Sequence, residues 1–484
     1  MKRKIYTLGI ALLLGCSACN DWLTVQPEST IVAENLFTTN EGVQQALNGV
    51  YLILRDELYT PGGYMGGADL VESLACTWTV TSGSDAYDLA DHVYDQSETV
   101  KSKLNSCFMS LYKVVSNLNP LLEGMDKNRF QLDSTVYNMV KGEALAIRAC
   151  AHLDLIRLWG PMPSKIDASK EYLPYVTVNG TAYYTYITFE RYMELLLADL
   201  NEAERLLRNS DPIITITPDG TEDTYSTWPR RKSHLNYYGV LGLQARVRLW
   251  MGDTENALKY ARMVKEAENE DGSPKFRLAN EEDDFPMQEN GLNSWTDGSF
   301  YSEHLCGVNV ENYDYNLGGW ISGRASVFFY TMNYSMFIQQ VFGGNSRDLR
   351  YRFLWTWERT LMGMNANVLR KWRGFYPSTT SSMMNFPIMR LSEIYLNIME
   401  HGSLSEANVV YEEYCEARGM TYVPLTESDR LAKVELEYIR EFMGEGQNFY
   451  TYKRLGVTNM YWNGLSECGE AQYVLPLPEK ELKN

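Results

Sequence analysis

Residues 241–257, LGLQARVRLWMGDTENA, and residues 391–407, LSEIYLNIMEHGSLSEA, place leucine or methionine, glycine and alanine at the same mutual spacing. A single glycine, Gly252 or Gly402, separates two stretches of helical pattern in each segment, and an alanine follows it five residues later. Glycine at such a position closes a turn, and a small alanine lets two helices approach closely. The spacing therefore predicts two copies of a helix-turn-helix pair.

These two copies match part of the tetratricopeptide consensus, which repeats a pair of helices. Two unrelated helical hairpins are the alternative, since glycine is common at helix C-termini. The shared spacing favours the repeat. We therefore predict an all-α fold of tetratricopeptide-like helical pairs, with long irregular loops that form the ligand site.

Helical patterns also predominate in the first half of the chain. From Val140 the apolar residues recur with a period of 3.6, and Gly160-Pro161 ends that helix sharply. Similar patterns predict helices at residues 41–58, 101–125, 189–207, 233–251 and 254–265.

Two segments lack a lasting period. Residues 270–385 are rich in acidic, glycine, asparagine and aromatic residues, and residues 59–95 contain paired glycines with aspartate and tryptophan. Because helices hold a scaffold while irregular segments tend to carry function, we expect ligand contacts in the first segment, with the second as a further candidate.

The composition restricts the ligand classes. The 484 residues carry 44 Lys and Arg against 62 Asp and Glu, a net charge of -18, which leaves no basic field to hold phosphates. We therefore expect no nucleic acid partner. The 34 tyrosines, 11 tryptophans and 16 phenylalanines offer flat amphipathic rings, which keeps ring-stacking ligands among the candidates.

The N-terminus predicts export. Basic residues 2–4 precede a short apolar run and then small residues, the pattern of a secretory signal over residues 1–18. The apolar run is too short to span a bilayer. Two overlapping lipobox patterns end at Cys16 and Cys19, so one acylated cysteine is predicted, and Leu13 locally favours Cys16. An ordinary signal cut nearby, leaving a periplasmic protein, is the alternative.

Motifs for catalysis and metal binding are absent from the sequence. It contains no G-x-x-x-x-G-K, H-E-x-x-H or G-x-S-x-G pattern, and its cysteines lack zinc spacing. His152 lies in a strongly apolar helix, where a packed, hydrogen-bonded ring is expected rather than a base. The acidic run 281–284 lacks the alternating ligands of a calcium loop. We assign no catalytic residue, metal site or cofactor.

Several short motifs, taken in order, resemble the SusD/RagB family of outer-membrane nutrient-binding lipoproteins of Bacteroidota. They are CNDWL at 19–23, ALNGVY at 46–51, KGEALAIR at 141–148, LWGPMP at 158–163, ARV at 245–247, LWMGD at 249–253, PIMRLSE at 387–393 and LPLP at 475–478. The resemblance covers nearly the whole chain after the signal.

This resemblance implies a cell-surface lipoprotein that captures an oligosaccharide, or in some members a peptide, without cleaving it. It implies a partner, a TonB-dependent barrel of the SusC type, over which the lipoprotein sits. Family members carry the lipid on a cysteine that precedes an Asn/Asp-rich stretch, which transfers to Cys19 and leaves Cys16 as the alternative. One SusD-like domain is expected over 19–484, with an N-terminal part at 19–230 and a C-terminal RagB/SusD part at 231–484.

Glycan capture calls for aromatic faces that pack on the C–H groups of sugar rings and for polar groups that bind hydroxyls. The candidate platform residues, chosen from the regions where family members place ligand loops, are Trp78, Trp295, Tyr301 and Trp320. The candidate hydroxyl-binding residues are Asp69, Asp85 and Asn309. As alternatives, each tryptophan belongs to the core or faces the barrel, and the two aspartates cap helices.

Two rival functions remain open at this point. An exported glycan-cleaving enzyme needs only a carboxylate pair, which a chain with 62 acidic residues always leaves possible. A repeat-based adaptor would bind only protein, as tetratricopeptide surfaces commonly do.

Overall fold

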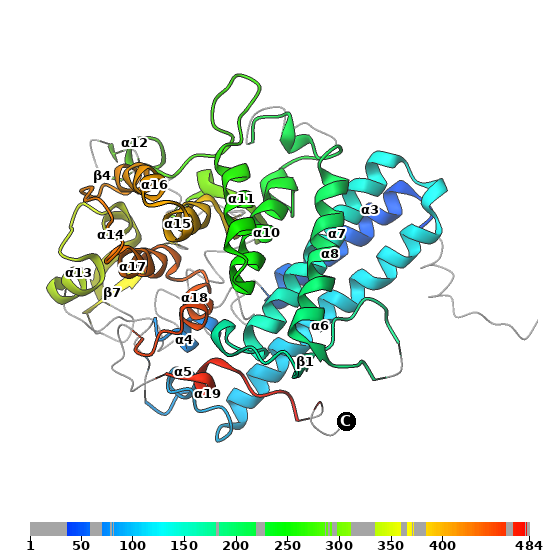
Figure 1. The fold of residues 1–484 in the computed structure, drawn as a ribbon, viewed down its shortest axis with the longest axis horizontal. Coiled ribbons are helices and arrows are strands. Elements are labelled where there is room, and N and C mark those ends of the chain that lie inside the picture. The colour runs from blue at the N-terminus through cyan, green and yellow to red at the C-terminus, as the bar shows by residue number, and fades with distance from the viewer. Residues whose placement is uncertain are drawn as a thin grey trace, which may run out of the picture.

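The computed structural model describes residues 36–58, 70–77, 80, 82–180, 183–218, 228–285, 287–288, 291–292, 298–310, 334–359, 365–369, 371, 384–460, 468–479 and 481. Within them helices predominate, and strands occur only in two-stranded sheets (Figure 1). Among the same residues, no helix is both long enough and apolar enough to cross a bilayer.

Long helices build the first half. They are α3 (Asn40–Ile53), which continues into the π-helical turn η1 (Leu54–Leu58), α6 (Glu98–Lys127), α7 (Ser134–Trp159) and α8 (Phe189–Leu207). The predicted sharp stop is confirmed, because Gly160 donates its N–H to Ile156 O at 2.9 Å and leaves the helical conformation. Helix α7 is buried on nearly every side because α6 and α8 both pack against it.

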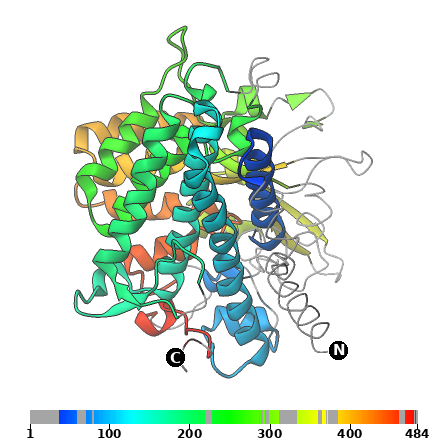
Figure 2. The same ribbon diagram turned by 90° about the vertical axis from the view of Figure 1, so that its right-hand side faces the viewer.

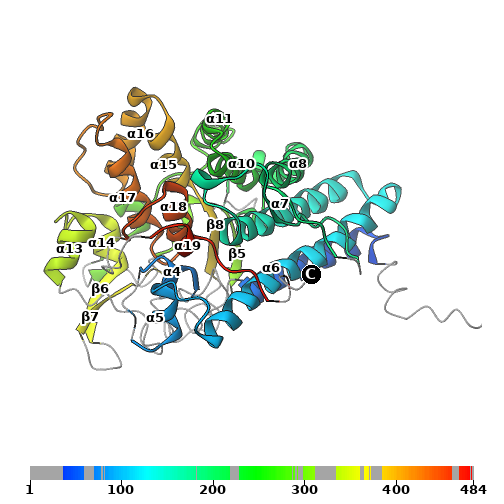
Figure 3. The same ribbon diagram turned by 60° about the horizontal axis from the view of Figure 1, so that its bottom comes forward.

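The two predicted helix pairs are confirmed as α10 (Tyr237–Met251) with α11 (Thr254–Lys265), and α15 (Leu391–His401) with α16 (Leu404–Ala417). Helix α11 packs on α15, so the two pairs stack against each other. Figure 3 shows α7, α8, α10, α11, α15 and α16 following one another across one side, with α4, α5, β6 and β7 on the other. Figure 2 shows α3 beside α6.

The remaining elements connect and cover these helices. They are α4 (Leu70–Leu74), α5 (Asp85–Ala90), η2 (Arg129–Gln131), η3 (Pro163–Lys165), β1 (Glu171–Leu173), β2 (Ile187–Thr188), η4 (Pro212–Ile214), η5 (Arg231–Ser233), α12 (Glu281–Asp284), β3 (Met287–Gln288), β4 (Gly291–Leu292), η6 (Tyr301–Glu303), β5 (His304–Val310), α13 (Tyr334–Phe342), α14 (Leu349–Leu354), β6 (Trp355–Arg359), β7 (Asn365–Leu369), β8 (Met384–Arg390), α17 (Arg430–Phe442), α18 (Asn448–Leu455) and α19 (Glu470–Tyr473).

The segment predicted as irregular, 270–385, contains regular structure in its described parts. Strand β5 pairs antiparallel with β8, and β6 pairs with β7. Strand β5 is buried at nearly every position and packs against α10. No periodic pattern predicted it because a strand covered on both faces does not alternate between apolar and polar residues.

A buried charge cluster joins the C-terminal elements. The guanidinium of Arg390 donates to Glu303 at 2.8 Å and to Glu441 at 2.9 Å, and that of Arg350 donates to Glu441 at 3.2 Å. Burial alone would raise the pKa of Glu441, but the surrounding guanidinium groups of Arg418 and Arg390 hold it well below its usual range. The cluster therefore fixes β8, η6, α14 and α17 through ionised, mutually satisfied groups.

Candidate functional site

Most of the side chains predicted to bind ligand lie outside the described residues. These are Asp69, Trp78, Trp295 and Trp320, together with both candidate lipidation sites, Cys16 and Cys19. Their roles stay predictions.

Asp85 is described, and its carboxylate is engaged within the fold. It lies in the first turn of α5, where the capping hydroxyl belongs to Ser84. The Asp85 Oδ2 atom lies 2.5 Å from Lys103 Nζ on α6. Partial burial alone would raise the pKa of Asp85, but the ammonium group of Lys103 lowers it. The carboxylate thus links α5 to α6, and its role toward a ligand stays a prediction.

Tyr301 and Asn309 lie on consecutive elements, η6 and β5. The Tyr301 ring contacts the His304 ring edge to face, with centroids 5.2 Å apart, and Lys232 Nζ lies 4.7 Å from the Tyr301 centroid. Asn309 is paired opposite Asn385 of β8. These two candidates therefore belong to the η6–β5 part of the fold. Asp85 belongs instead to the contact between α5 and α6.

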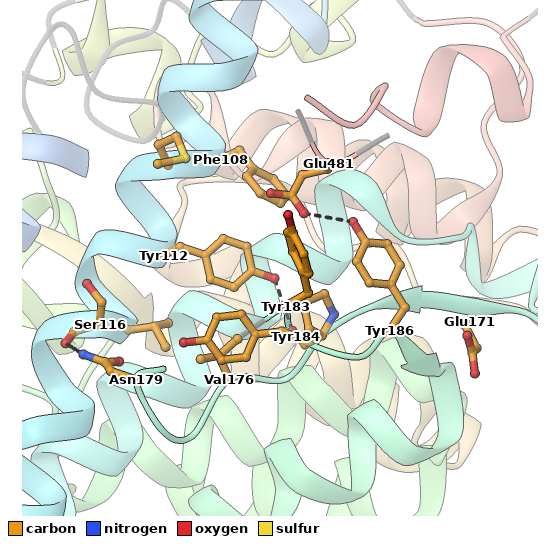
Figure 4. A pocket seen from close by; sticks show the side chains of 13 residues that line it. Phe108, Tyr112, Ser116, Glu171, Val176, Asn179, Tyr183, Tyr184, Tyr186 and Glu481 are labelled. Atoms are coloured by element: carbon orange, nitrogen blue, oxygen red, sulfur yellow. Dashed lines mark hydrogen bonds between the residues drawn. The ribbon is translucent and has the colours of Figure 1, made fainter. Parts of the chain in front are cut away.

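A cavity of about 670 Å³ opens elsewhere, between α6 and the segment that runs from β1 to β2 (Figure 4). We call it the tyrosine pocket, because four tyrosines line it with Glu481 from the C-terminal segment. Its lining residues are Phe108, Met109, Tyr112, Val115, Ser116, Glu171, Pro174, Val176, Asn179, Tyr183, Tyr184, Tyr186 and Glu481.

The floor of the tyrosine pocket is aromatic and firmly held. The Tyr112 hydroxyl donates to Pro174 O at 3.2 Å, and its ring packs on buried Phe108 with centroids 4.9 Å apart. Behind it, His152 stacks on Tyr175 at 3.9 Å. Burial lowers the pKa of His152 to about 3, so this ring is neutral at physiological pH.

The packed, hydrogen-bonded state predicted for His152 is confirmed. Its Nδ1 lies 2.8 Å from the Tyr192 hydroxyl, and its Nε2 faces the backbone of Val176. It has no access to a ligand, since the ring is fully buried.

The rim of the pocket presents tyrosine rings to solvent. Tyr183 is 82% exposed and Tyr184 is 42% exposed. The Tyr184 hydroxyl accepts a hydrogen bond from Gly180 N at 2.9 Å, and the Tyr186 hydroxyl donates to Glu481 Oε2 at 3.2 Å. Burial and the neighbouring Glu481 carboxylate raise the pKa of Tyr186 to about 12, so the phenol stays protonated. The hydroxyls of Tyr184 and Tyr186 thus hold these two rings in place, while Tyr183 presents its ring to solvent.

A hydrogen-bond chain fastens the tyrosine segment to the helices. Asn179 Nδ2 donates to Ser116 O at 2.6 Å, and Asn179 Oδ1 accepts from Asn119 Nδ2 at 3.1 Å. Asn119 in turn accepts from Arg148 at 3.1 Å, and Arg148 forms a bidentate pair with Asp199, both contacts at 2.7 Å. Buried charges at α7 and α8 therefore position a loop at the surface.

The tyrosine pocket offers both aromatic faces and hydrogen-bonding groups to a ligand. The described residues that line it combine aromatic faces with the carboxylates of Glu171 and Glu481, the amide of Asn179 and several hydroxyls, and they include no lysine, arginine or histidine. Within the described part of the chain, no group of three or more His, Cys, Asp or Glu side chains could hold a metal ion.

No residue of this pocket was predicted from the sequence. A local signal existed, since Tyr183, Tyr184 and Tyr186 fall within four positions of a segment with no helical pattern. The other contributors, Phe108 and Glu481, are far away in sequence, so only the fold unites them.

Comparisons with known proteins agree at the level of sequence motif and fold. A SusD-like family model described as "Starch-binding associating with outer membrane" matches residues 21–218. Two SusD-like proteins from Formosa agariphila are each 27% identical to this chain, over 168 and 202 residues. The matches cover 34% and 42% of this chain and 31% and 37% of those proteins, so the chain aligns with about a third of each relative's length.

Solved structures match over most of the chain. A SusD superfamily protein from Bacteroides thetaiotaomicron has a TM-score of 0.69 at 20% identity and covers 92% of this chain and 98% of its own. A SusD-like carbohydrate binding protein from Bacteroides vulgatus has a TM-score of 0.61 at 19% identity, covering 86% and 83%. The mostly helical fold with tetratricopeptide-like pairs, as predicted, is thereby confirmed.

Proposed function

We propose that this chain, which is a SusD-like protein, captures a carbohydrate ligand at the cell surface. The observation that carries the proposal is the tyrosine pocket, in which partly exposed rings stand beside carboxylate, amide and hydroxyl groups. The descriptions of its relatives, as starch-binding and carbohydrate binding, support the same ligand class.

Sugar recognition follows from the chemistry of the two surfaces. The C–H faces of a pyranose pack on flat aromatic rings, and its hydroxyl edges seek acceptors and donors in fixed positions. Tyrosine supplies both a ring face and a hydroxyl at low entropic cost, because only two torsions need to be fixed. The rings of Tyr183 and Tyr184 would pack on the sugar, while the Glu171 carboxylate would bind hydroxyl groups.

Delivery completes the proposal. A lipid on Cys19, with Cys16 as the alternative, would anchor the protein to the outer membrane after removal of residues 1–18. A SusC-like TonB-dependent transporter would then receive the ligand. The predicted platform of Trp78, Trp295, Tyr301 and Trp320, with Asp69, Asp85 and Asn309, would form a further part of the capture surface.

A peptide ligand is the second candidate, because tyrosine surfaces also bind peptides. Cleavage is less well supported, since one pocket carboxylate, Glu481, is already held by the Tyr186 hydroxyl. One experiment tests carbohydrate binding, peptide binding and glycan cleavage together.

The test is calorimetric titration of the soluble form, beginning at Asp21, against plant, microbial and host glycans and against mixed peptides. We expect one glycan class to bind, and Tyr183→Ala to weaken that binding by about tenfold, the loss of one stacking ring. The matched control is Phe130→Ala, since the Phe130 ring is also largely exposed but lies at η2, away from the pocket. Binding of peptides alone, or release of new reducing ends, would replace the proposal with the corresponding rival.

A further inference from the structure

A second hollow adjoins the tyrosine pocket on the surface of α6. It has a volume of about 570 Å³ and shares Met109, Tyr112 and Ser116 with the tyrosine pocket. The shared residues form the border between the two, and Met109 is 63% exposed there. The two hollows together, which we call the α6 groove, therefore follow one continuous surface.

The α6 groove is longer than a single sugar ring. Its contributors on α6 run from Ser106 to Ser116, which corresponds to about 15 Å of helix at 1.5 Å per residue. A chain that crosses the stripe of Met109, Tyr112 and Ser116 would contact Tyr183 on one side and the hollow of Glu57 and Lys113 on the other. The shape thus fits an oligomer better than a monosaccharide.

The charges that line the α6 groove are mostly negative. Glu171 and Glu481 lie in the tyrosine pocket, and Glu57 lies in the second hollow. The one cation among the described lining residues is Lys113, whose ammonium group is ion-paired with Glu57. Ser110 also donates to Glu57, at 3.1 Å, which holds this pair in place.

The charged groups beneath the groove do not offset the negative charge of its lining. His152 is neutral, and the charge of Arg148 is matched by the bidentate contact with Asp199. Among the residues that the structure describes here, an acidic ligand would therefore meet carboxylates without a free guanidinium or ammonium group to pair with. A ligand with only hydroxyl groups would find acceptors in the same carboxylates.

We propose that the α6 groove binds an extended glycan chain that carries no acidic groups and that it discriminates against uronate-containing and sulfated chains. This inference rests on the proposed function, because it names the ligand class of the same site. It adds two properties, selection by charge and contact with several sugar units across the two adjoining hollows.

The experiment compares two glycans of equal length and linkage, one neutral and one with its primary hydroxyls oxidised to carboxylates, by calorimetric titration. At low ionic strength we expect the oxidised chain to bind at least about tenfold more weakly, and the difference to shrink in about 0.5 M salt because salt screens exposed charges. Equal or tighter binding of the oxidised chain would overturn the charge selection.

Two variants refine the test. Glu171→Gln is expected to strengthen binding of the oxidised chain by about fivefold, the size of one unscreened charge contact in water, and so to narrow the difference in affinity between the oxidised and the neutral chain. Met109→Ala is expected to weaken the binding of long neutral chains by about fivefold, the loss of part of one apolar contact, and to weaken the binding of monosaccharides less. Phe130→Ala is the control for both.

Each failure has its own signature. If long and short chains respond alike to Met109→Ala, the extended groove is wrong while the tyrosine pocket stands. If no glycan of either charge binds, the proposed function fails and the charge selection fails with it.

Discussion

Arg418 and Glu441 form a buried two-point ion pair, with Nε 3.0 Å from Oε2 and Nη2 2.8 Å from Oε1. The Arg418 Nη2 atom also lies 2.7 Å from Glu303 Oε1, and its Nη1 donates to Ala279 O at 3.0 Å. One fully buried side chain thus joins the end of α16 to α17, η6 and the segment before α12. Its removal would leave two carboxylates buried without this partner.

We therefore expect Arg418→Met to lower the free energy of unfolding by about 3–5 kcal/mol, the usual cost of breaking a buried pair from one side. Urea denaturation followed by circular dichroism measures it. The control is Arg262→Met, which removes the partly exposed pair with Glu406 and should cost at most about 1 kcal/mol. Equally small losses of unfolding free energy in both variants would show that the buried charge cluster does not stabilise the fold.

The two equally spaced glycines of the helix pairs predict different responses to substitution. Gly252 has φ +79°, the left-handed region, and a Cβ there would meet open space. Gly402 has φ -64°, but a Cβ there would lie 2.7 Å from Ile398 O. Alanine is therefore strained by its backbone at one position and by a steric clash at the other.

We expect each alanine variant to lose about 1–2 kcal/mol in unfolding free energy. Asparagine separates the causes, because it tolerates the left-handed conformation better than alanine does. Gly252→Asn should recover part of the loss, whereas Gly402→Asn should recover none. Thermal unfolding of the four variants measures the pattern, and an equal recovery at both glycines would contradict it.

The same two glycines show which features of the fold the sequence predicts and which it does not. The residue spacing predicted both helix pairs, and the sequence also predicted that α7 ends at Gly160. Both features depend on local periodicity and turn chemistry. The residue spacing could not tell that Gly252 takes the left-handed conformation and Gly402 does not, because both turns are compatible with the same residue spacing. The predicted helices at 189–207 and 254–265 coincide with α8 and α11.

The site was harder to predict than the scaffold. Tyr186 and Glu481 meet across 295 positions of sequence, and no local pattern encodes such a contact. Asp85 is predicted to bind hydroxyls because it lies in a region where family members place ligand loops, yet its carboxylate pairs with Lys103 on α6, whose orientation the sequence pattern does not specify. Which loop side chains face a ligand therefore depends on long-range packing, and composition and spacing do not specify that packing.

The buried His152 ring predicts a loss of stability in mild acid. Burial lowers its pKa to about 3, while the unfolded chain has the ordinary value of about 6.5. Between these values the unfolded state binds the additional proton, so stability is complete above about pH 6.5 and falls as the pH decreases toward 3. The slope from this ring is at most about 1.4 kcal/mol per pH unit. His92, whose pKa burial lowers to about 4, acts in the same direction.

Urea unfolding at pH 7.5, 6.0 and 5.0 measures the effect. His152→Gln should be less stable at pH 7.5, because it loses contacts with Tyr192 and the backbone of Val176. Its free energy of unfolding should nevertheless fall less steeply between pH 6.0 and 5.0, by up to about 1.4 kcal/mol. Parallel pH profiles for the two proteins would show that this ring does not carry the dependence.

Asn179 is a positioning residue for the tyrosine pocket, and its loss should weaken ligand binding without removing a ring. Its side chain fastens the exposed 177–180 segment to α6 through Ser116 O and Asn119 Nδ2. In Asn179→Ala the segment that leads to Tyr183 would have to be ordered by the ligand, which costs conformational entropy at binding. We expect about a three- to tenfold loss of glycan affinity, seen in calorimetry as a less favourable entropy.

Hydrogen exchange separates this positioning role from direct contact with the sugar. In unliganded Asn179→Ala, exchange should accelerate over residues 177–180 and 183–186 and stay unchanged in α7, because only the fastening of the loop is lost. The matched control is Asn117→Ala, an asparagine on the exposed face of α6 whose side chain donates to Lys113 O of its own helix, so glycan affinity and loop exchange should both stay as they are in the parent protein. Weaker binding with unchanged exchange would mean that Asn179 contacts the ligand directly instead of holding the loop.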